Sequence, residues 1–338
     1  MNNGELVREV IEKLSEGKDL SPEQTNRIFS EIMNGNLTPA QVGGILVGFK
    51  AKGETSQEVA AAAEAMLSKA VRVKTKAPCI DTCGTGGDGK GTVNISTLVA
   101  LVVAACGIPV AKHGNRSVSS RCGSADLLES LEIPLPERSE EVEESIQKTG
   151  FGFIFAPAFH PAMRHAMGPR RELGTRTIFN ILGPLVNPAA PKFQMVGVYK
   201  KELLPLVGEA LLALGRERVC VVHSEDGLDE ASIADTTTVW FGTSSGTRRE
   251  FTISPQELGL TPRPLSEIAG GDARHNAKMA IEVLSGRRSA TRDAVLLNAT
   301  LAMYTAGREG LVENLNAAAA AIDSGAAMGV VEKLRNQA

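Results

Sequence analysis

The chain has 338 residues, a length that predicts two domains. Hydrophobic residues make up 43% of it, enough for a large core, and 36 Lys and Arg against 39 Asp and Glu leave a formal net charge of -3. This balance gives no electrostatic footprint for nucleic acid or an anionic membrane, and aromatic residues at 4% argue against a stacking platform for single strands. We therefore expect a globular protein with neither nucleic acid nor membrane as a partner.

The cysteines and the N-terminal segment indicate in which cellular compartment the protein works. Five cysteines, an odd number without a Cys-x-x-Cys pair, argue against a disulfide framework or a cysteine zinc cluster. The N-terminal segment, MNNGELVREVIEKL, contains acidic residues where a signal or transit peptide would contain basic ones. The longest apolar run, residues 98–106, is shorter than the roughly 18 residues of a membrane span. We expect a cytoplasmic protein.

Residues 1–72 are predicted to form helices in series. Residues 21–24 (SPEQ) and 38–41 (TPAQ) each place a hydroxyl at the N-cap, proline at the first helical position and Gln two residues later, which is a capping box. Residues 55–58 (TSQE) are a third candidate. The spacing of one buried helix face follows the second cap, at Val42, Ile45, Leu46 and Phe49. The sequence predicts a small all-helical domain, which we expect part of residues 165–190 to join.

From about residue 75 onward, short strand-like runs alternate with helical segments. The strand-like runs are CIDTC (79–83), IPVAKHG (108–114), FGFIFAP (151–157), MVGVY (195–199), RVCVVHS (218–224) and TVWFG (238–242). Helices are predicted between several of them, for example over residues 202–214, and again over 292–305 and 311–320. This alternation indicates crossover connections and a mostly parallel central sheet, so the fold class is α/β with a domain over residues 75–338. A cleft between the two domains is a favoured place for a ligand.

The glycine-rich segment at residues 84–92 (GTGGDGKGT) follows a predicted strand and precedes a predicted helix. Glycines let backbone N–H groups approach an anion, and a helix N-terminus adds partial positive charge. The spacing matches a dinucleotide fingerprint, but Lys112 and His113 stand about where an acidic residue is expected. It also nearly matches a nucleotide P-loop, but Gly91 replaces the Ser or Thr that would bind magnesium. An ordinary surface turn is the alternative to a phosphate-binding loop.

A second candidate loop covers residues 112–121 (KHGNRSVSSR). It concentrates cations, hydroxyls and an amide, the donors that phosphate oxygens require. Two such loops at successive strand ends predict a ligand with separate phosphate groups, and a solvated basic loop is the alternative.

Several motifs, taken in order, resemble one family. They begin with residues 81–88 (DTCGTGGD), 94–97 (NIST), 112–116 (KHGNR) and 123–126 (GSAD). They continue with FHPAM (159–163), RRELG (170–174), RTIFNILGPL (176–185) and GLDE (227–230). The ordered set resembles the anthranilate phosphoribosyltransferases, from about residue 20 to the C-terminal helices.

The resemblance implies a fold and a reaction. The fold is of the nucleoside phosphorylase/phosphoribosyltransferase type, with a small helical domain hinged to a larger α/β domain. The reaction moves phosphoribose from 5-phosphoribosyl 1-pyrophosphate to the amine of anthranilate, in tryptophan biosynthesis. The resemblance also implies a homodimer and two Mg²⁺ ions in each active site.

Carried over by position, the resemblance implies a set of site residues. Phosphoribosyl pyrophosphate would contact Gly84, Gly87, Asp88, Thr92, Asn94, Ile95, Ser96, Thr97, Lys112, His113, Gly114, Asn115, Arg116, Ser117, Val118, Ser119, Ser120 and Ser124. Anthranilate would meet Gly84, Asn115 and Arg170, and the metal ligands would be Ser96, Asp229 and Glu230.

Each of these roles has a plainer alternative. Asp229 and Glu230 suit Mg²⁺, but they could form a solvent-facing acidic turn. Arg170 suits a carboxylate clamp, but it could pair with Glu172 on the surface, and Arg171 could contact the substrate instead. His113 is the candidate for a direct chemical role, and a structural histidine is the alternative.

Three other functions remain open from sequence. A pyrimidine nucleoside phosphorylase shares the expected fold, but its Lys-His-Ser stretch is replaced here by residues 82–84 (TCG). A nicotinamide oxidoreductase rests on the glycine spacing alone. A non-catalytic relative that binds phosphoribosyl compounds or nucleic acid is the third, and the net charge of -3 argues against the latter ligand.

Overall fold

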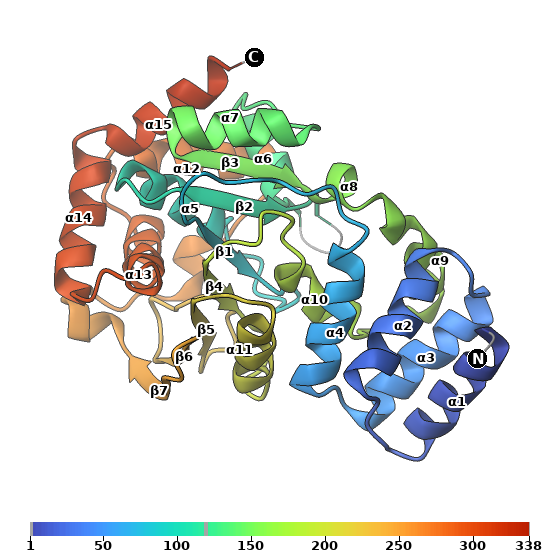
Figure 1. The fold of residues 1–338 in the computed structure, drawn as a ribbon. Helices are drawn as coiled ribbons and strands as arrows, with labels where there is room; N and C mark the ends of the chain where they lie inside the picture. The colour runs from blue at the N-terminus through green and yellow to red at the C-terminus, as the bar shows by residue number, and fades with distance from the viewer. Residues whose placement is uncertain (1–2, 118–120, 338) are drawn as a thin grey trace.

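The structure, a computed structural model, describes residues 3–117 and 121–337. Its N-terminal part is a bundle whose helices are α1 (Asn3–Ser15), α2 (Pro22–Met33), α3 (Pro39–Lys52) and α4 (Ser56–Leu67) (Figure 1). The three predicted capping boxes are confirmed at the starts of α2, α3 and α4, with N-caps Ser21, Thr38 and Thr55. Each satisfies backbone N–H groups that the first turn leaves unpaired.

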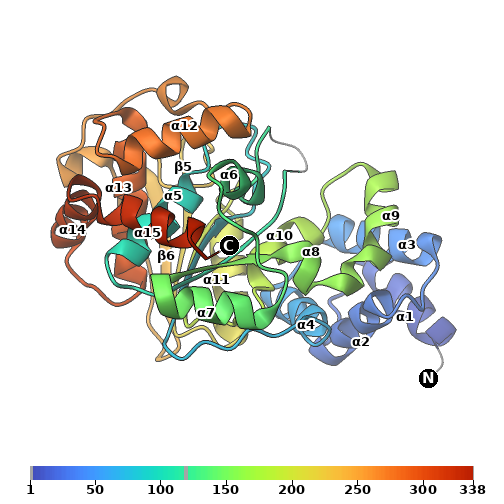
Figure 2. The same ribbon diagram turned by 90° about the horizontal axis from the view of Figure 1, so that it is seen from above.

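The bundle is completed by a segment that comes much later in the chain. Helix α9 (Arg164–Leu173) packs against α2 and α3, and its Ala166 is fully buried in the apolar cluster of the bundle. Figure 2 shows α9 on the side of α1, α2 and α3, away from the sheet. By contrast, α10 (Phe179–Leu185) packs against α4 and α11 (Leu203–Ala213). The chain therefore enters the bundle twice.

The remainder is built on a seven-stranded sheet in the order β3-β2-β1-β4-β5-β6-β7. The strands are β1 (Ile80–Gly84), β2 (Val110–Gly114), β3 (Phe151–Phe155), β4 (Phe193–Gly197), β5 (Arg218–Ser224), β6 (Thr237–Thr243) and β7 (Arg248–Ile253). All pairs from β3 to β5 are parallel, and the β5–β6 and β6–β7 pairs are antiparallel. The predicted mostly parallel sheet is thus confirmed, and β7 is an additional edge strand.

Helices cover both faces of the sheet. Helices α5 (Ile95–Ala105) and α13 (Ala290–Thr305) pack on one face, while α7 (Ser139–Thr149) and α11 pack on the other. Alternation along β3 shows the two faces, because Phe151 and Phe153 belong to the core beneath α5 whereas Ile154 packs with residues of α7. The other elements are α6 (Ser124–Ser130), α8 (Ala156–Phe159), η1 (Pro161–Met163), η2 (Pro255–Leu258), η3 (Leu265–Ile268), α12 (Ala273–Leu284), α14 (Leu311–Asp323) and α15 (Ala326–Arg335).

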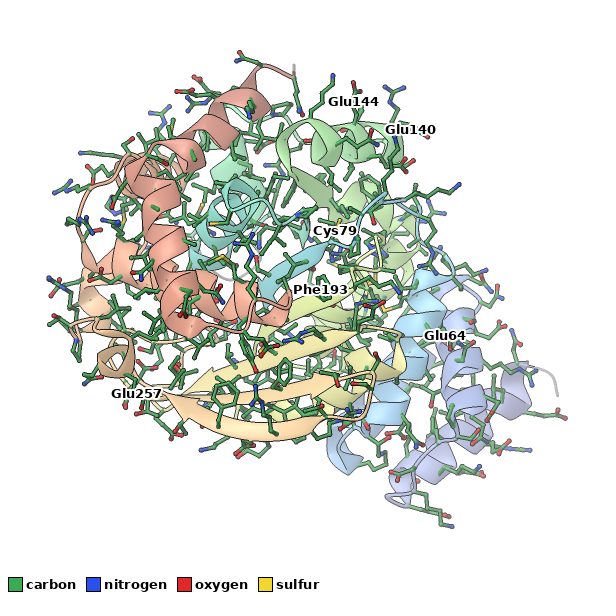
Figure 3. The ribbon with its side chains drawn as sticks, turned by 60° about the vertical axis from the view of Figure 1, so that its left-hand side comes forward. Glu64, Cys79, Glu140, Glu144, Phe193 and Glu257 are labelled. Carbon is green, nitrogen blue, oxygen red and sulfur yellow. The ribbon has the colours of Figure 1, made fainter. Side chains whose placement is uncertain are left out.

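The bundle and the sheet share one apolar cluster. It runs from Phe29 and Phe49 in the bundle through α4 and α11 to Val196, Val219 and Trp240 on the sheet. On the sheet itself, β1 and β4 start side by side: Figure 3 shows Cys79 and Phe193 close together, and the N–H of Phe193 donates to the Cys79 carbonyl at 3.1 Å. The packed joint fixes where the bundle stands relative to the strand ends.

The connections reverse direction at β1. After β1 the chain builds outward through β2 to β3, and it then returns to the opposite side of β1 to form β4 and β5. In open α/β sheets a crevice opens at such a switch point, beyond the carboxyl ends of the strands, and ligands bind there. The fold therefore directs attention to the segments that follow Gly84 and Gly197.

Two further observations concern the cysteines and the length of the apolar helices. The five cysteines, all of them within the described residues, form no disulfide. Among residues 3–117 and 121–337, no helix is both long enough and apolar enough to cross a membrane.

Candidate functional site

The loop after β5 folds onto the ends of β1 and β4. The N–H of Gly86 donates to Asp229 Oδ2 at 2.7 Å. A Cβ at Gly84 would overlap the Asp229 carboxylate, and a Cβ at Gly197 would overlap the carbonyl oxygen of Asp229. Both strands thus need glycine at their last residue because the acidic loop rests directly on them.

The carboxylates of Asp229 and Glu230 are held together in a buried place, each residue being 9% exposed. Burial, the neighbouring Glu230 and the nearby Asp88 raise the pKa of Asp229 well above its usual value. Burial also raises the pKa of Glu230 to about 7, although Lys112 and hydrogen bonds to Ser96 oppose the rise. This is not a solvent-facing acidic turn, and a divalent cation would relieve the repulsion in it. The donor set of two carboxylates and a hydroxyl fits Mg²⁺.

Lys112, at the start of the second predicted loop, connects β2 to β1 and to the first turn of α5. Its side chain is 2% exposed, and its ammonium donates to the carbonyl of Thr82 and to Ser96 Oγ, the latter at 3.4 Å. A buried ammonium needs such partners because its desolvation is costly. It supplies positive charge beside Glu230 and a defined position for Ser96.

The glycine loop lines a cavity of about 900 Å³ whose other side is formed by α9 and the residues that follow it. Gly86, Gly87, Gly89 and Gly91 all have positive φ, between 63° and 78°, a conformation that other residues rarely adopt. The cavity wall includes the predicted Gly87, Asp88, Thr92 and Arg170, together with Arg171, Arg176 and Asn180. The backbone of this loop therefore forms part of the cavity wall, which an ordinary surface turn would not do.

Asn94 ties the glycine loop to its surroundings. Its amide donates to the Cys122 carbonyl at 3.0 Å, and its Oδ1 accepts from Asn276 at 2.9 Å. Asn276 Oδ1 in turn accepts from the N–H of Gly271 at 2.8 Å. Asn276, which the sequence did not single out, therefore lines the cavity and also holds Asn94 in place.

Some predicted contacts can be made through the backbone alone. The side chains of Ile95 and Thr97 lie in the protein interior, each residue 1% exposed. The guanidinium of Arg116 is paired with Glu129 and with Asp126, the latter at 3.3 Å. Those acidic partners draw the Arg116 side chain toward α6.

The second loop folds back on the start of α6. Ser124 Oγ donates to the Asn115 carbonyl at 3.3 Å, and the N–H of Ser117 donates to Asp126 Oδ2 at 3.0 Å. Ser124 Oγ occupies the place that a Cβ at Gly114 would need. The predicted Val118, Ser119 and Ser120 lie outside the described residues.

The sequence matches two family profiles that divide the chain as the structure does. The profile described as glycosyl transferase family, helical bundle domain covers residues 8–70, and glycosyl transferase family, a/b domain covers residues 76–328. The chain is 45% identical over 334 residues to anthranilate phosphoribosyltransferase from Persephonella marina, covering 98% of both chains. It is 46% identical over 327 residues to the enzyme of that name from Halorhodospira halophila, covering 96% of this chain and 95% of the relative. The chain belongs to the anthranilate phosphoribosyltransferase family.

Solved structures of family members superpose closely. The anthranilate phosphoribosyltransferase of Thermus thermophilus has a TM-score of 0.91 and 41% identity, covering 97% of this chain and 98% of that one. The Saccharomyces cerevisiae enzyme, solved in complex with PRPP and Mg, has a TM-score of 0.90 and 28% identity, covering 99% and 98%. The helical bundle with its α/β domain is thus the family's fold.

Within this family member, Arg170 projects from α9 into the cavity. It is half-buried, its guanidinium lies 5.0 Å from the centroid of the Phe179 ring, and burial lowers its pKa. Among residues 3–117 and 121–337, no carboxylate lies within 4.0 Å of it, so the structure gives no support for pairing with Glu172. Arg171 is exposed at the rim of the same cavity.

His113 lies deeper, beside another histidine. Its ring centroid is 5.2 Å from that of His160. Burial, and then the neighbouring His160, lower the pKa of His113 to about 3, and burial lowers the pKa of His160 to about 4. In the described part of the chain, Nε2 of each ring is buried without a hydrogen-bond partner. Neutral rings in such a place favour a structural role over proton transfer.

Arg176 is a residue of the cavity that sequence reasoning quoted in a motif but gave no role. Its guanidinium donates to the Gly87 carbonyl and lies 4.0 Å from the centroid of the Tyr199 ring. It separates the main cavity from a neighbouring one of about 880 Å³, which is lined by Lys50, Tyr199 and Lys200 among others. The signal that could have indicated a role for Arg176 was its place at the start of the 176–185 motif, directly after the segment that contains Arg170.

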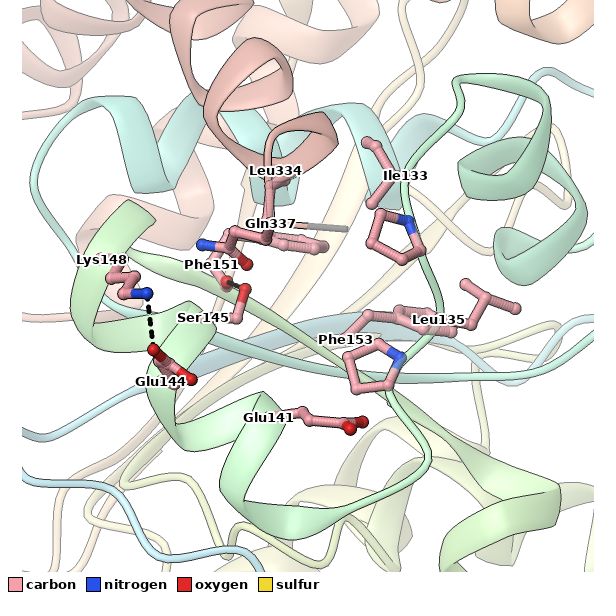
Figure 4. Close-up of a pocket in the computed structure, with 12 residues that line it drawn as sticks. Ile133, Leu135, Glu141, Glu144, Ser145, Lys148, Phe151, Phe153, Leu334 and Gln337 are labelled. Atoms are coloured by element: carbon pink, nitrogen blue, oxygen red, sulfur yellow. Dashed lines mark hydrogen bonds and ion pairs between the residues drawn. The ribbon is translucent and has the colours of Figure 1, made fainter.

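A smaller cavity lies apart from this site. It measures about 250 Å³ and is enclosed by α7, β3 and α15 (Figure 4). Its wall is mainly apolar, with Leu135, Phe153 and Leu334, and the Glu144–Lys148 ion pair stands beside it. It shares no residue with the cavities at the strand ends.

Proposed function

We propose that this chain transfers the phosphoribosyl group of 5-phosphoribosyl 1-pyrophosphate to the amine of anthranilate, a step of tryptophan biosynthesis that releases pyrophosphate. The observation that carries the proposal is 45% identity over 98% of the chain to an anthranilate phosphoribosyltransferase. Two features support it: the glycine loop and Arg170 line one cavity, and the buried acidic pair contacts the same loop through Asp229.

Donor binding would use the backbone of the glycine loop and the first turn of α5. Glycines let the backbone approach an anion closely, and a helix N-terminus adds partial positive charge, so a phosphate is favoured there. Displacement at an anomeric carbon develops positive charge on the ribose and negative charge on the leaving group. Donors fixed in advance by Lys112 and Asn94 would stabilise that charge without reorganising during the reaction.

We assign two Mg²⁺ ions to the acidic loop and Ser96. Asp229 with Glu230 would hold one ion and the Ser96 hydroxyl the other, with substrate phosphate oxygens completing the coordination. When bound, the ions neutralise charge that develops on the leaving pyrophosphate. The raised pKa values of both carboxyl groups are consistent with a site that awaits positive charge.

Arg170 would orient anthranilate through its carboxylate. A guanidinium meets a carboxylate with two parallel hydrogen bonds, which fix the direction of the ring and its amine. An aromatic amine held in line is a competent nucleophile, so positioning and electrostatics supply most of the catalysis. His113, the residue we predicted for a direct role, would instead be a structural residue whose neutral ring packs against His160.

We further propose that the protein is a cytoplasmic homodimer that associates through its helical bundle. Cysteines that form no disulfide among the described residues suit a reducing compartment. Analytical ultracentrifugation tests the dimer directly, and a monomer at micromolar concentration would contradict it.

The decisive experiment follows anthranilate fluorescence after purified protein is mixed with phosphoribosyl pyrophosphate. We expect a loss of fluorescence that requires Mg²⁺ and that EDTA abolishes. An unchanged signal would refute the proposal. Phosphorolysis of uridine in parallel would instead identify a nucleoside phosphorylase.

A further inference from the structure

The acidic loop holds two mutually repelling carboxylates, and buried side chains behind it fix its backbone. Repulsion between these two adjacent carboxylates would displace the loop that carries them. Three anchors oppose that movement, and they come from β4, β5 and α13.

The anchor from α13 is Asn298, which is 1% exposed. Its Oδ1 accepts from the N–H of Ala231 at 2.9 Å, and its Nδ2 donates to the carbonyl of Ala231 at 2.8 Å. The same Nδ2 donates to the Ala294 carbonyl of its own helix at 2.9 Å. One side-chain amide thus forms hydrogen bonds with both the backbone N–H and the backbone carbonyl of Ala231, the residue that follows Glu230.

The anchor from β5 is Ser224, which is fully buried. Its hydroxyl donates to the Glu230 carbonyl at 2.7 Å and accepts from the N–H of Ser232 at 3.0 Å. Thr237 Oγ1 lies 2.7 Å from the same hydroxyl and also accepts from Ser232. The backbone on both sides of Ala231 is therefore tied to the sheet.

The third anchor is steric. Gly197 at the end of β4 lets the Asp229 carbonyl rest on the strand, where any Cβ would displace it. Together with the hydrogen bonds from Asn298 and Ser224, this contact fixes the backbone of the loop in one position.

We propose that Asn298, supported by Ser224, is a positioning residue that presents Asp229 and Glu230 to the metal. This rests on the proposed function. Residues that orient metal ligands from behind commonly change metal affinity by about 10- to 100-fold when they are removed. Asn298 reaches the ligands through the backbone, so its loss misplaces both carboxylates while leaving their chemistry intact.

The test measures Mn²⁺ binding by the electron paramagnetic resonance signal of the free ion, with phosphoribosyl pyrophosphate present. We expect Asn298→Ala to raise the Kd for Mn²⁺ by about tenfold. The Mg²⁺ concentration for half-maximal rate should rise in parallel, with a smaller change in kcat at saturating metal. Ser224→Ala should act in the same direction and decides the question if Asn298→Ala does not fold.

Thr300→Ala is the matched control. Thr300 is fully buried on the same helix, and its hydroxyl donates to the Leu296 carbonyl of that helix at 2.8 Å. It should lower Tm without changing the Kd for Mn²⁺. If the folded Asn298 and Ser224 variants bind Mn²⁺ as tightly as Thr300→Ala, the positioning role is overturned. Failure of the wild-type protein both to bind Mn²⁺ and to turn over would overturn the proposed function itself.

Discussion

Arg170 illustrates how much depends on a single side chain in the cleft. We expect Arg170→Ala to raise the KM for anthranilate by about 10- to 100-fold, since hydrogen bonds to a charged group contribute about 1.5–3 kcal/mol. The KM for phosphoribosyl pyrophosphate should change far less, because Arg170 lies on α9 and not on the donor loops. Steady-state kinetics with each substrate varied in turn measures both.

Arg171→Ala provides the control for that comparison. Arg171 borders the same cavity but is exposed, so its removal should have a small effect on either KM. Equal effects of Arg170→Ala on the two substrates would place Arg170 outside the acceptor site.

His160 makes stability depend on pH. Its pKa is about 4 in the folded chain against an ordinary 6.5, so the unfolded chain binds more protons between these values. Its contribution is therefore intact above pH 6.5 and is lost as the pH falls toward 4. Between pH 7 and pH 5 the free energy of unfolding should fall by about 2 kcal/mol from this residue.

Urea unfolding at the two pH values checks this. In the His160→Gln variant, the fall in the free energy of unfolding from pH 7 to pH 5 should be smaller than in the wild type by about that amount. The value of each protein at pH 7 is the reference for its own fall. An unchanged difference between pH 7 and pH 5 in the variant would rule out His160 as its source.

At the scale of the elements, Glu58 binds residues from the connections that precede α2 and α4 and from the end of α3. This carboxylate is fully buried and accepts from the N–H of Leu20 at 2.9 Å, from Thr55 at the start of α4, and from Lys52 Nζ at 2.8 Å. Asp19 also pairs with Lys52 at 2.7 Å, so removal of Glu58 leaves the ammonium one partner. We expect Glu58→Ala to destabilise the protein by about 3 kcal/mol, near the lower end for a broken buried pair.

Glu64→Ala is the comparison for that variant. Glu64 lies on the same helix but is exposed, as Figure 3 shows, and its loss should change the free energy of unfolding by less than about 0.5 kcal/mol. Chemical denaturation distinguishes the two, and similar effects would contradict the role of Glu58.

Local rules explain which elements the sequence could predict. The capping boxes at Ser21, Thr38 and Thr55 depend on residues three apart, so they are visible in the chain itself. Strand β7 was not predicted, because Arg248, Arg249 and Glu250 are exposed on an edge and show no apolar alternation.

The sequence could propose members of the site, but it could not predict how their side chains are placed. The motif around Ile95 and Thr97 could not show that their side chains face the core, since backbone and side-chain contacts have the same sequence signature. The contact of Asp229 with Gly84 and Gly197 follows from the order of β1, β4 and β5 in the sheet. That order is a property of the whole fold and is not encoded in any single segment.

At the scale of the whole molecule, the cleft between bundle and sheet should respond to its ligands. A ligand that binds the folded chain alone stabilises it by about 2.7 kcal/mol at a concentration of 100 times its Kd. We expect phosphoribosyl pyrophosphate with Mg²⁺ to raise Tm, and EDTA to remove most of that increase because the acidic pair then repels the donor. Differential scanning fluorimetry with the donor alone, the metal alone and both together tests this, and an increase that survives EDTA would contradict it.

The late arrival of α9 has a consequence for synthesis of the chain. Helices α1 to α4 are made first, but α9, which covers α2 and α3, follows after β1, β2 and β3. Because chains emerge from the ribosome N-terminus first, the nascent bundle exposes an apolar surface while three of the seven strands are being translated. The interval is a window for chaperone capture or misassociation, and it closes when residue 173 has left the exit tunnel.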